Sequence, residues 1–445
     1  MKLLIIRGDL QSHSGYSAAM RDYSLQLREL FDRLIGVDIH YSSDRPYERC
    51  PFPLVSEPEA RHLSEHADFA LVLSMTTPDC YACYPNCVNV GLTFWETDRL
   101  PLQGAERSPW VAQANRMDAL WAPSTHIKEA FQAAGVVTPI RVIPWPIRVP
   151  PPQKEGLPNG EVYDLDRSPW LSGSLLALAR FREPRFRWSR WLTQHGAPRA
   201  AARLLARLRT PAHRIPLPHE RALLCVAQDV PRKGLLLLLS EWMEFKRQSE
   251  AKPWVLIVKT TPINPQTPKF DFVIRFWEHV QALKRQLWVD QADVFLWTGN
   301  LAAADFDRLL NNTFGQVAPS LGEGFCGPAA AALALGKPLV APRHTAFADY
   351  IPPDYPYAFL TRPVRVSFVG DPLRVYDPAS TWNVPVPYSL AGAITRLAID
   401  LPERRAEACR RARIHMHNWC GPDRVHALLE EEVKRLAALP ARLAA

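Results

Sequence analysis

The chain has 445 residues, of which 47% are hydrophobic and 22% charged, and this composition is ordinary for a globular protein. No apolar run approaches the roughly 18 residues that a membrane-spanning helix needs, which argues against an integral membrane protein. The length exceeds what one ordinary core organises and predicts two domains of about 200 residues each.

The net charge of +8 is unevenly distributed along the chain. Residues 167–219 contain eleven arginines, no lysine and one acidic residue, Glu183, so this segment carries +10 and leaves −2 for the rest. The sequence therefore predicts a nearly neutral body with a basic insert.

Cysteine usage and the N-terminal residues favour a reducing compartment. The eight cysteines are scattered over a large chain, and the start turns polar after six residues, too soon for a secretory signal. We therefore expect a cytoplasmic protein. Cys80, Cys83 and Cys87 have C-x2-C-x3-C spacing and could hold zinc or an iron–sulfur cluster with Cys50. No second metal-ligand pair follows, so we expect neither a metal nor another cofactor.

Strand-like and helical runs alternate in two series. The first has strands at 3–6, 69–73, 88–93 and 119–122, a helix at 18–31 and a proline-rich exit at 140–146. The second has strands at 223–227, 254–259, 294–297, 316–319 and 338–341, and a closing helix near 404–419. Such alternation predicts α/β domains with doubly wound parallel sheets, and ligands at the carboxyl ends of the strands.

These series define the expected domain organisation. The first domain spans residues 1–165 and is completed by a C-terminal helix in 420–445. An Arg-rich insert follows at 166–219, and the second domain spans 220–419. A central cleft is expected between the two domains.

The insert is expected to form an amphipathic basic helix. One face carries Arg199, Arg203, Arg207 and Arg209, and the other carries Leu204, Leu205 and Leu208. Upstream, the aromatic residues Phe181, Phe186, Trp188 and Trp191 lie among arginines. Two interpretations stay open: a solvated helix packed on its own domain, and a surface for anionic lipid through residues 180–210. No nucleic-acid-binding motif accompanies the insert, so no nucleic-acid partner is expected.

The segment 319–338, PSLGEGFCGPAAAALALGKP, joins a glycine loop to an Ala-rich helix. A helix that begins near Pro328 and ends before Gly336 directs its free N–H groups at a ligand over the loop, and phosphate suits such a place. The glycines also satisfy G-x-G-x-x-G, with Asp349 where a ribose-binding acid would lie, so a dinucleotide site and a plain core helix are alternatives. Several strands precede the loop, which disfavours the dinucleotide site because that fingerprint normally opens its domain.

Several motifs follow one another in the chain: SHSGYSAAMRDY, NVGLTFWETDRLP, NRMDALWAPSTHIKEAFQAAGV, IRVIPWPI, LLCVAQDVPRKGLLLLLSEW and PSLGEGFCGPAAAALALGKPLVAP. They cover most of residues 1–345 outside the insert. Together and in this order they resemble the retaining glycosyltransferases of family 4, which have the GT-B architecture.

The resemblance implies a function. It implies two Rossmann-like domains around a cleft, and the metal-independent, retaining transfer of a hexose from a nucleoside diphosphate sugar to a lipid-linked or cell-surface glycan. The insert would then hold the enzyme at the inner face of the membrane. A separate and weaker hypothesis does not rest on this resemblance: a Rossmann oxidoreductase that uses Gly322 to Gly327.

The resemblance also assigns roles to residues. Glu323 would contact sugar hydroxyls, Glu96 would orient the acceptor or take its proton, and His13 would approach the acceptor or the diphosphate. The expected donor-binding residues are Gly15, Gln228, Lys233, Lys259, Gly324, Phe325, Cys326 and Gly327, with Lys233 on the diphosphate. Arg232 is expected to be exposed.

Two positions depart from the family pattern. Ala331 stands where the family has a second glutamate, and Gln228 stands where it has an arginine. Together they remove a ribose acceptor and a positive charge. Lys259 is the candidate to supply the missing charge. A catalytically inactive GT-B scaffold that binds glycan or a partner glycosyltransferase is therefore the alternative.

Overall fold

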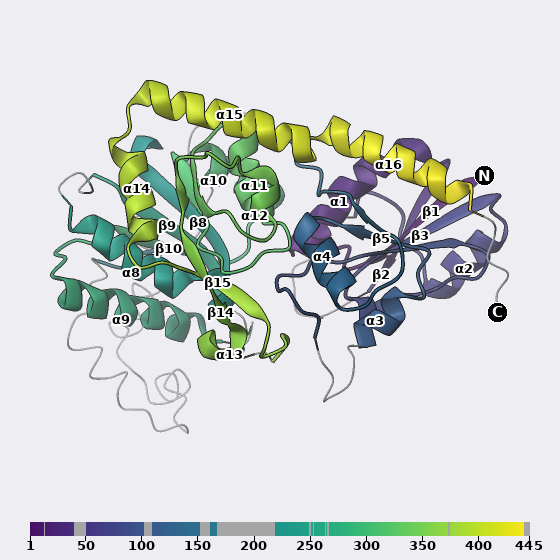
Figure 1. Cartoon of the computed structure of the whole chain (residues 1–445), viewed down its shortest axis with the longest axis horizontal. Coiled ribbons are helices and arrows are strands. Elements are labelled where there is room, and N and C mark those ends of the chain that lie inside the picture. Colours follow the sequence, from purple (N-terminus) through teal and green to yellow (C-terminus); the bar gives the residue numbers. More distant parts are fainter. Residues whose placement is uncertain are drawn as a thin grey trace, which may run out of the picture.

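The computed structural model describes residues 1–12, 14–39, 50–101, 109–151, 161–166, 219–248, 251, 253–262, 264, 267–372 and 374–439. His13 and residues 167–218, nearly all of the expected insert, lie outside the described residues, so their roles stay predictions. Two α/β domains lie side by side along the long axis of the molecule, and two long helices run across both (Figure 1).

A six-stranded, entirely parallel sheet forms the first domain, with the order β2-β1-β3-β4-β5-β6. Its strands are β1 (Lys2–Gly8), β2 (Arg33–Asp38), β3 (Phe69–Met75), β4 (Val88–Leu92), β5 (Ala119–Ala122) and β6 (Ile140–Val142). The middle strands β1 and β3 read KLLIIRG and FALVLSM, nearly continuous apolar runs that suit strands covered on both faces. The doubly wound sheet expected from the sequence is thus confirmed.

Helices cover this sheet and follow local sequence signals. They are α1 (Gly15–Leu27), α2 (Glu57–Glu65), α3 (Pro109–Ala114) and α4 (Thr125–Ala133). Ser14 caps α1 by accepting a hydrogen bond from the Ser17 amide, so this helix begins three residues before the predicted one. The buried face of α1 includes Met20 and Tyr23. In the described ranges, no helix of the molecule is both long and apolar enough to cross a bilayer.

The second domain is built on a seven-stranded sheet with the order β13-β12-β11-β8-β9-β10-β7. Its strands are β7 (Glu161–Asp164), β8 (Ala222–Asp229), β9 (Val255–Pro262), β10 (Val294–Thr298), β11 (Gly315–Val317), β12 (Leu339–Pro342) and β13 (Ala358–Phe359). The helices are α8 (Leu235–Lys246), α9 (Lys269–Leu287), α10 (Ala303–Asn311), α11 (Gly327–Ala334), α12 (Phe347–Tyr350) and α14 (Ser389–Ile399). All of its neighbouring strands are parallel except β7 and β10.

The antiparallel strand β7 corrects the predicted domain boundary. Residues up to 165 were assigned to the first domain, but β7 pairs with β10 at the edge of the second sheet. Asp166 holds it there, because its carboxylate accepts hydrogen bonds from the Ala292 and Asp293 amides at 3.0 and 2.5 Å. The chain therefore enters the second domain before Glu161.

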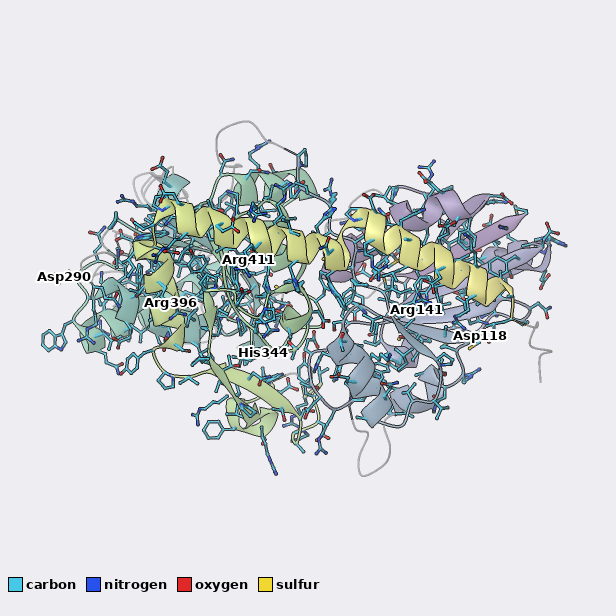
Figure 2. The ribbon with its side chains drawn as sticks, turned by 45° about the horizontal axis from the view of Figure 1, so that its top comes forward. Asp118, Arg141, Asp290, His344, Arg396 and Arg411 are labelled. Atoms are coloured by element: carbon cyan, nitrogen blue, oxygen red, sulfur yellow. The ribbon has the colours of Figure 1, made fainter. Side chains whose placement is uncertain are left out.

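The C-terminal helices connect the two domains. α15 (Pro402–Cys420) packs on α11 and α12, and α16 (Pro422–Ala437) packs on α1. Figure 2 shows Arg411 along α15 and Arg141 below α16. Arg141 anchors α16 through an ion pair with Glu431 at 2.7 Å. The chain thus returns to the first domain after Gly421.

An antiparallel hairpin projects from the second domain, and we call residues 361–385 the arm. It comprises β14 (Thr361–Arg365), the short helix α13 (Val366–Val369) and β15 (Thr381–Pro385). Val366 and Trp382, each 1% exposed, pack with Leu321 and fix the arm to its domain. No sequence motif predicted this element.

Candidate functional site

Glu323 lies in the loop between β11 and α11, at the carboxyl edge of the second sheet. The residue is only 4% exposed. Its carboxylate accepts hydrogen bonds from Lys233 Nζ at 2.5 Å, Ser320 Oγ at 2.6 Å and Arg232 Nη1 at 3.3 Å. Glu323 and Lys233, which the sequence assigned to one site, are therefore in direct contact.

A tight turn presents the two cations to Glu323. Pro231 to Lys233 form a 3₁₀ turn that ends at Gly234, whose φ of 64° is left-handed. A Cβ at Gly234 would lie 2.3 Å from the Pro319 carbonyl oxygen, so only glycine lets the two loops approach. The Arg232 carbonyl also accepts a hydrogen bond from the Leu321 amide at 2.7 Å. The turn is thus fixed directly onto the loop that carries Glu323.

Arg232 was expected to be exposed, and this prediction is wrong. Its side chain is only 13% exposed because it bridges carboxylates from both domains. Nη2 lies 3.0 Å from Glu96 Oε1, and Nη1 lies 3.3 Å from Glu323 Oε2. The sequence motif around Arg232 and Lys233 gave no signal for this bridge, because the bridge depends on Glu96, which belongs to the other domain.

Glu96 follows β4 in the first domain and meets the second domain at two points. Besides Arg232, it contacts Tyr376 of the arm, whose hydroxyl donates to Glu96 Oε2 at 3.0 Å. Glu96, Arg232, Glu323 and Lys233 form what we call the charge cluster. Its two positive and two negative side chains come from both domains and sum to zero.

The pKa shifts in the charge cluster reflect burial and ion pairing. Burial alone would raise the pKa of Glu323, but Lys233 and Arg232 hold it below its ordinary value of 4.5. Burial opposes the charge on Arg232, yet Glu96, Tyr376 and Glu323 raise its pKa overall. The carboxylate of Glu323 is therefore ionised at neutral pH, and Arg232 is a cation.

The glycines of the 322–327 loop allow the first domain to approach closely. A Cβ at Gly322 would lie 2.4 Å from the Glu96 carbonyl oxygen, and one at Gly324 would lie 2.8 Å from the Trp95 amide nitrogen. A Cβ at Gly327 would meet the Trp145 ring at 2.6 Å. We call this contact, between residues 322–327 on one side and 94–96 and Trp145 on the other, the seam.

Phe325 and Cys326 shape the seam from within. Phe325 is 2% exposed and packs against Trp145 and Tyr350, with ring centroids 5.6 and 5.5 Å apart. Cys326 precedes α11 with a left-handed φ of 69°, unusual for a side chain other than glycine. Burial raises the pKa of the Cys326 thiol to about 12, so it stays protonated at neutral pH.

Three other predicted donor residues lie outside the charge cluster. Gly15 opens α1 and is exposed, and a Cβ there would meet nothing within 4 Å. Lys259, near the end of β9, is partly buried, and burial lowers its pKa below 10.5. Within the described part of the chain it makes no ion pair. Gln228 is exposed near the end of β8, which lies beside β9, the strand that carries Lys259.

Asp349, the acid that the dinucleotide interpretation assigned to a ribose, has a structural partner instead. Asp349 accepts a hydrogen bond from the Thr125 amide at 2.8 Å and so caps α4 of the other domain. Among the residues described, no group of three or more His, Cys, Asp or Glu side chains is arranged to hold a metal ion. Cys80, Cys83 and Cys87 therefore show no such cluster with Cys50.

Solved structures resemble this chain over almost its whole length. The sucrose-phosphate synthase of Thermosynechococcus elongatus is 13% identical with a TM-score of 0.54, over 98% of this chain and 100% of that one. A Rickettsia africae glycosyltransferase is 11% identical with a TM-score of 0.55, over 99% of each chain. The UDP-forming α,α-trehalose-phosphate synthase of Burkholderia vietnamiensis is 9% identical with a TM-score of 0.53, over 99% and 100%. The fold is GT-B. No family model and no curated protein sequence matches the chain.

Two histidines of this GT-B chain were missed by sequence reasoning. His126 lies on α4 of the first domain, and His344 follows β12 of the second. Burial lowers the pKa of His126 to about 4 and that of His344 to about 3, so both are neutral at pH 7. His344 Nδ1 lies 3.2 Å from Thr345 Oγ1, which accepts a hydrogen bond from the Glu323 amide. Neither histidine has a motif spacing that would have revealed it.

Proposed function

We propose that this chain is a glycosyltransferase that moves a hexose from a nucleoside diphosphate sugar to an acceptor hydroxyl. The observation that carries the proposal is the charge cluster: Lys233 and Arg232 converge on Glu323 where the two domains of a GT-B fold meet. The UDP-forming synthase among the structural neighbours supports a nucleoside diphosphate as the leaving group.

The chemistry of transfer explains why such cations are needed. When the bond between the anomeric carbon and the diphosphate oxygen breaks, the electron pair stays with the diphosphate, which gains negative charge. Lys233, and Arg232 beside it, stabilise that charge in the transition state more than in the ground state, which lowers the barrier. The acceptor oxygen bonds to the anomeric carbon, and its proton passes to a base, a role we assign to Glu96.

Donor binding must then rearrange the charge cluster. Lys233 and Arg232 are paired with carboxylates, so a diphosphate competes with Glu323 and Glu96 for them. A released Glu323 carboxylate is free to accept hydrogen bonds from sugar hydroxyls. The exchange leaves Lys233 and Arg232 paired with the diphosphate and gives Glu323 sugar hydroxyls as hydrogen-bond donors, which offsets part of the cost of several kcal/mol for an isolated buried charge.

The finer features of the proposal follow the resemblance to family 4. We propose retention of the anomeric configuration, catalysis without a metal ion, and a lipid-linked or cell-surface glycan as the acceptor. Gly15 and Lys259 complete the diphosphate site in this proposal, with Lys259 in place of the positive charge that Gln228 lacks. A peripheral position at the inner face of a membrane, through residues 180–210 of the Arg-rich insert, belongs to the same proposal.

Incubation with UDP-, GDP- and ADP-sugars tests the proposal. We expect one donor to release its nucleoside diphosphate, and we expect Glu323→Ala to reduce that release by about a hundredfold or more. A matched control is Glu129→Ala, which removes an exposed acid of α4. If no donor is cleaved and no nucleotide binds saturably, the proposal is wrong.

A second candidate is an inactive GT-B scaffold that binds glycan or a partner glycosyltransferase. The close packing at the seam favours it, because residues 94–96 and Trp145 lie directly over the glycine loop. Ala331 and Gln228 favour it as well, since the first lacks the ribose acceptor and the second lacks the positive charge that the family uses. Turnover of any donor that is lost in Glu323→Ala would eliminate this candidate.

A further inference from the structure

The arm exposes three arginines that make no ion pair with any described residue. They are Arg362, Arg365 and Arg374. The acidic groups of the arm bind its own backbone: Asp371 Oδ2 accepts the Val375 amide at 2.6 Å. The arm carries three arginines and two aspartates, so its formal net charge is +1.

The second acid of the arm is buried. Asp377 is 6% exposed, and its Oδ1 accepts a hydrogen bond from the Ala379 amide at 2.8 Å. It therefore stabilises a turn and offers no carboxylate to the exposed arginines. The three exposed arginines are thus accessible to an anionic partner from outside the molecule.

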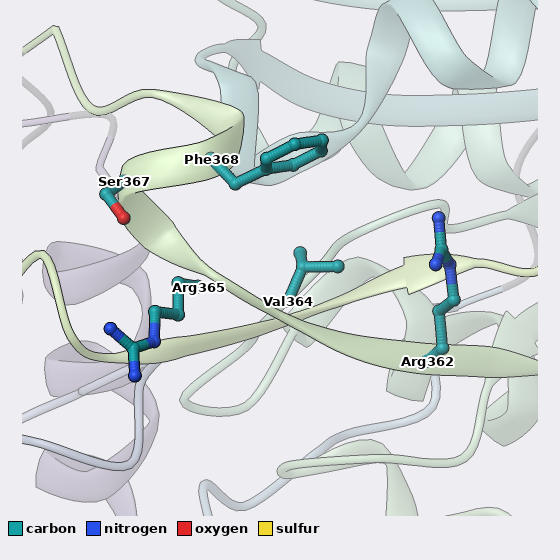
Figure 3. A pocket seen from close by; sticks show the side chains of 5 residues that line it. All are labelled: Arg362, Val364, Arg365, Ser367 and Phe368. Carbon is teal, nitrogen blue, oxygen red and sulfur yellow. The ribbon is translucent and has the colours of Figure 1, made fainter.

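Two of these arginines and an exposed ring line one shallow hollow of the arm. Figure 3 shows Arg362 and Arg365 along the strand with Val364 between them, and Phe368 and Ser367 on the adjoining turn. Phe368 is 82% exposed, and Leu360, just before the arm, is 71% exposed. Cationic and large apolar side chains are thus presented together.

We propose that the arm docks on an anionic lipid bilayer. Arginine pairs with phosphate through several N–H donors, and an aromatic ring beside it settles at the headgroup level, where its apolar body leaves water. A soluble phosphate would use the guanidinium groups of Arg362 and Arg365 but would leave Phe368 in water. An anionic bilayer offers phosphate groups and apolar chains side by side, so it uses both kinds of side chain.

The arm is also tied to the charge cluster. Besides the Tyr376 hydrogen bond to Glu96, the Thr381 amide donates to Asp98 Oδ1 at 2.7 Å and the Asn383 amide donates to the Leu321 carbonyl at 2.8 Å. A docked arm therefore holds both sides of the seam at the lipid surface. That an acceptor is delivered from this surface rests on the proposed function, whereas docking itself does not.

Cosedimentation of the full chain with vesicles, without nucleotide, tests the docking. We expect binding to equal parts of phosphatidylcholine and phosphatidylglycerol but not to phosphatidylcholine alone. The double variant Arg362→Gln with Arg365→Gln should bind about thirtyfold more weakly, since each basic residue contributes about fivefold at an anionic surface. Phe368→Ser should bind roughly tenfold more weakly.

Matched controls come from exposed side chains elsewhere. Arg404→Gln with Arg413→Gln removes two exposed arginines of α15, and Trp288→Ser removes a ring that is 91% exposed. Both should bind anionic vesicles like the parent chain, and replacement of Arg362 and Arg365 by lysine should preserve most binding. Thermal unfolding of each variant checks that its fold is intact.

Failure of the parent chain to bind anionic vesicles would overturn the docking proposal, and so would either of two further results. One is vesicle binding by the Arg362 and Arg365 double variant that equals that of the parent chain, because the bound surface would then lie elsewhere. The other is a Phe368→Ser variant with undiminished binding together with full displacement of the parent chain by inorganic phosphate, which would identify a soluble-anion site. Loss of turnover in Glu323→Ala with intact vesicle binding would count against neither, so the two proposals fail separately.

Discussion

At the scale of single residues, Glu323 is held by more partners than an exposed carboxylate would need. Ser320, Lys233 and Arg232 surround it, and their hydrogen bonds offset the cost of burying a charge. Such a pairing is stable only while the partners remain. The stability of the protein therefore reports directly on this contact.

Lys233→Met should destabilise the fold by about 2 to 3 kcal/mol at neutral pH, because Glu323 loses its shortest ion pair in a buried place. The pKa of Glu323 is depressed in the native state, so its contribution is present above about pH 4.5 and is lost as pH falls through the native pKa. The difference between parent and variant should therefore shrink in acid. Urea unfolding at neutral pH and near pH 4 measures both values.

Lys128→Met is the control for this prediction. Lys128 lies on α4 and makes no ion pair with any described residue, so its loss should change stability by less than about 0.5 kcal/mol. Equal stability of Lys233→Met and Lys128→Met would mean that the Lys233 contact contributes nothing.

Gly15 gives a second prediction at the residue scale. Gly15→Ala should raise stability by about 0.5 to 1 kcal/mol, since alanine favours a helix and its Cβ meets nothing within 4 Å. If a donor diphosphate lies over Gly15, the added methyl group should weaken nucleotide binding about tenfold. Calorimetric titration and thermal unfolding separate the two effects.

Gly392→Ala in α14 is the matched control for Gly15. Its Cβ would have only Arg396 Nη1 within 4 Å, at 3.7 Å, so it should raise stability as well but leave nucleotide binding unchanged. A Gly15→Ala variant that binds nucleotide like the parent would remove Gly15 from the proposed donor site.

At the scale of elements, the arm connects the second domain to Glu96. Tyr376→Phe should cost about 1.5 to 3 kcal/mol, because it removes a hydrogen bond from a hydroxyl to a carboxylate that is largely buried. Urea unfolding measures the change. The control is Tyr388→Phe, because Tyr388 is 66% exposed and its hydroxyl bonds to no described residue. A loss no greater than that of Tyr388→Phe would contradict the role given to Tyr376.

Local sequence predicted most parallel strands and the loop that carries Glu323, because buried strands read as apolar runs and helix ends carry glycine and proline. The same signals could not reveal the arm, since its strand 361–365, TRPVR, contains a proline and has no buried residue. Strand β7 was missed for a similar reason. At four residues it depends on its neighbour β10 rather than on its own pattern.

At the scale of the whole molecule, the GT-B fold brings together groups that lie far apart in the chain. Glu96 and Arg232 are 136 positions apart in sequence but 3.0 Å apart across the domains. Motif order predicted the fold and assigned Lys233 and Glu323 to one site, and their direct contact is a finding of the structure. It could not predict the bridge by Arg232 or the burial of His126 and His344, because these depend on how closely the domains pack.

Nucleotide binding tests the central claim most directly. Calorimetric titration of UDP, GDP and ADP into the parent chain should give saturable binding for one of them. Lys233→Met should weaken that binding by about tenfold or more through loss of a charge-assisted contact, while Lys128→Met leaves it unchanged. Failure of all three nucleotides to bind, or equal affinity in the parent and Lys233→Met, would contradict a donor site at the charge cluster.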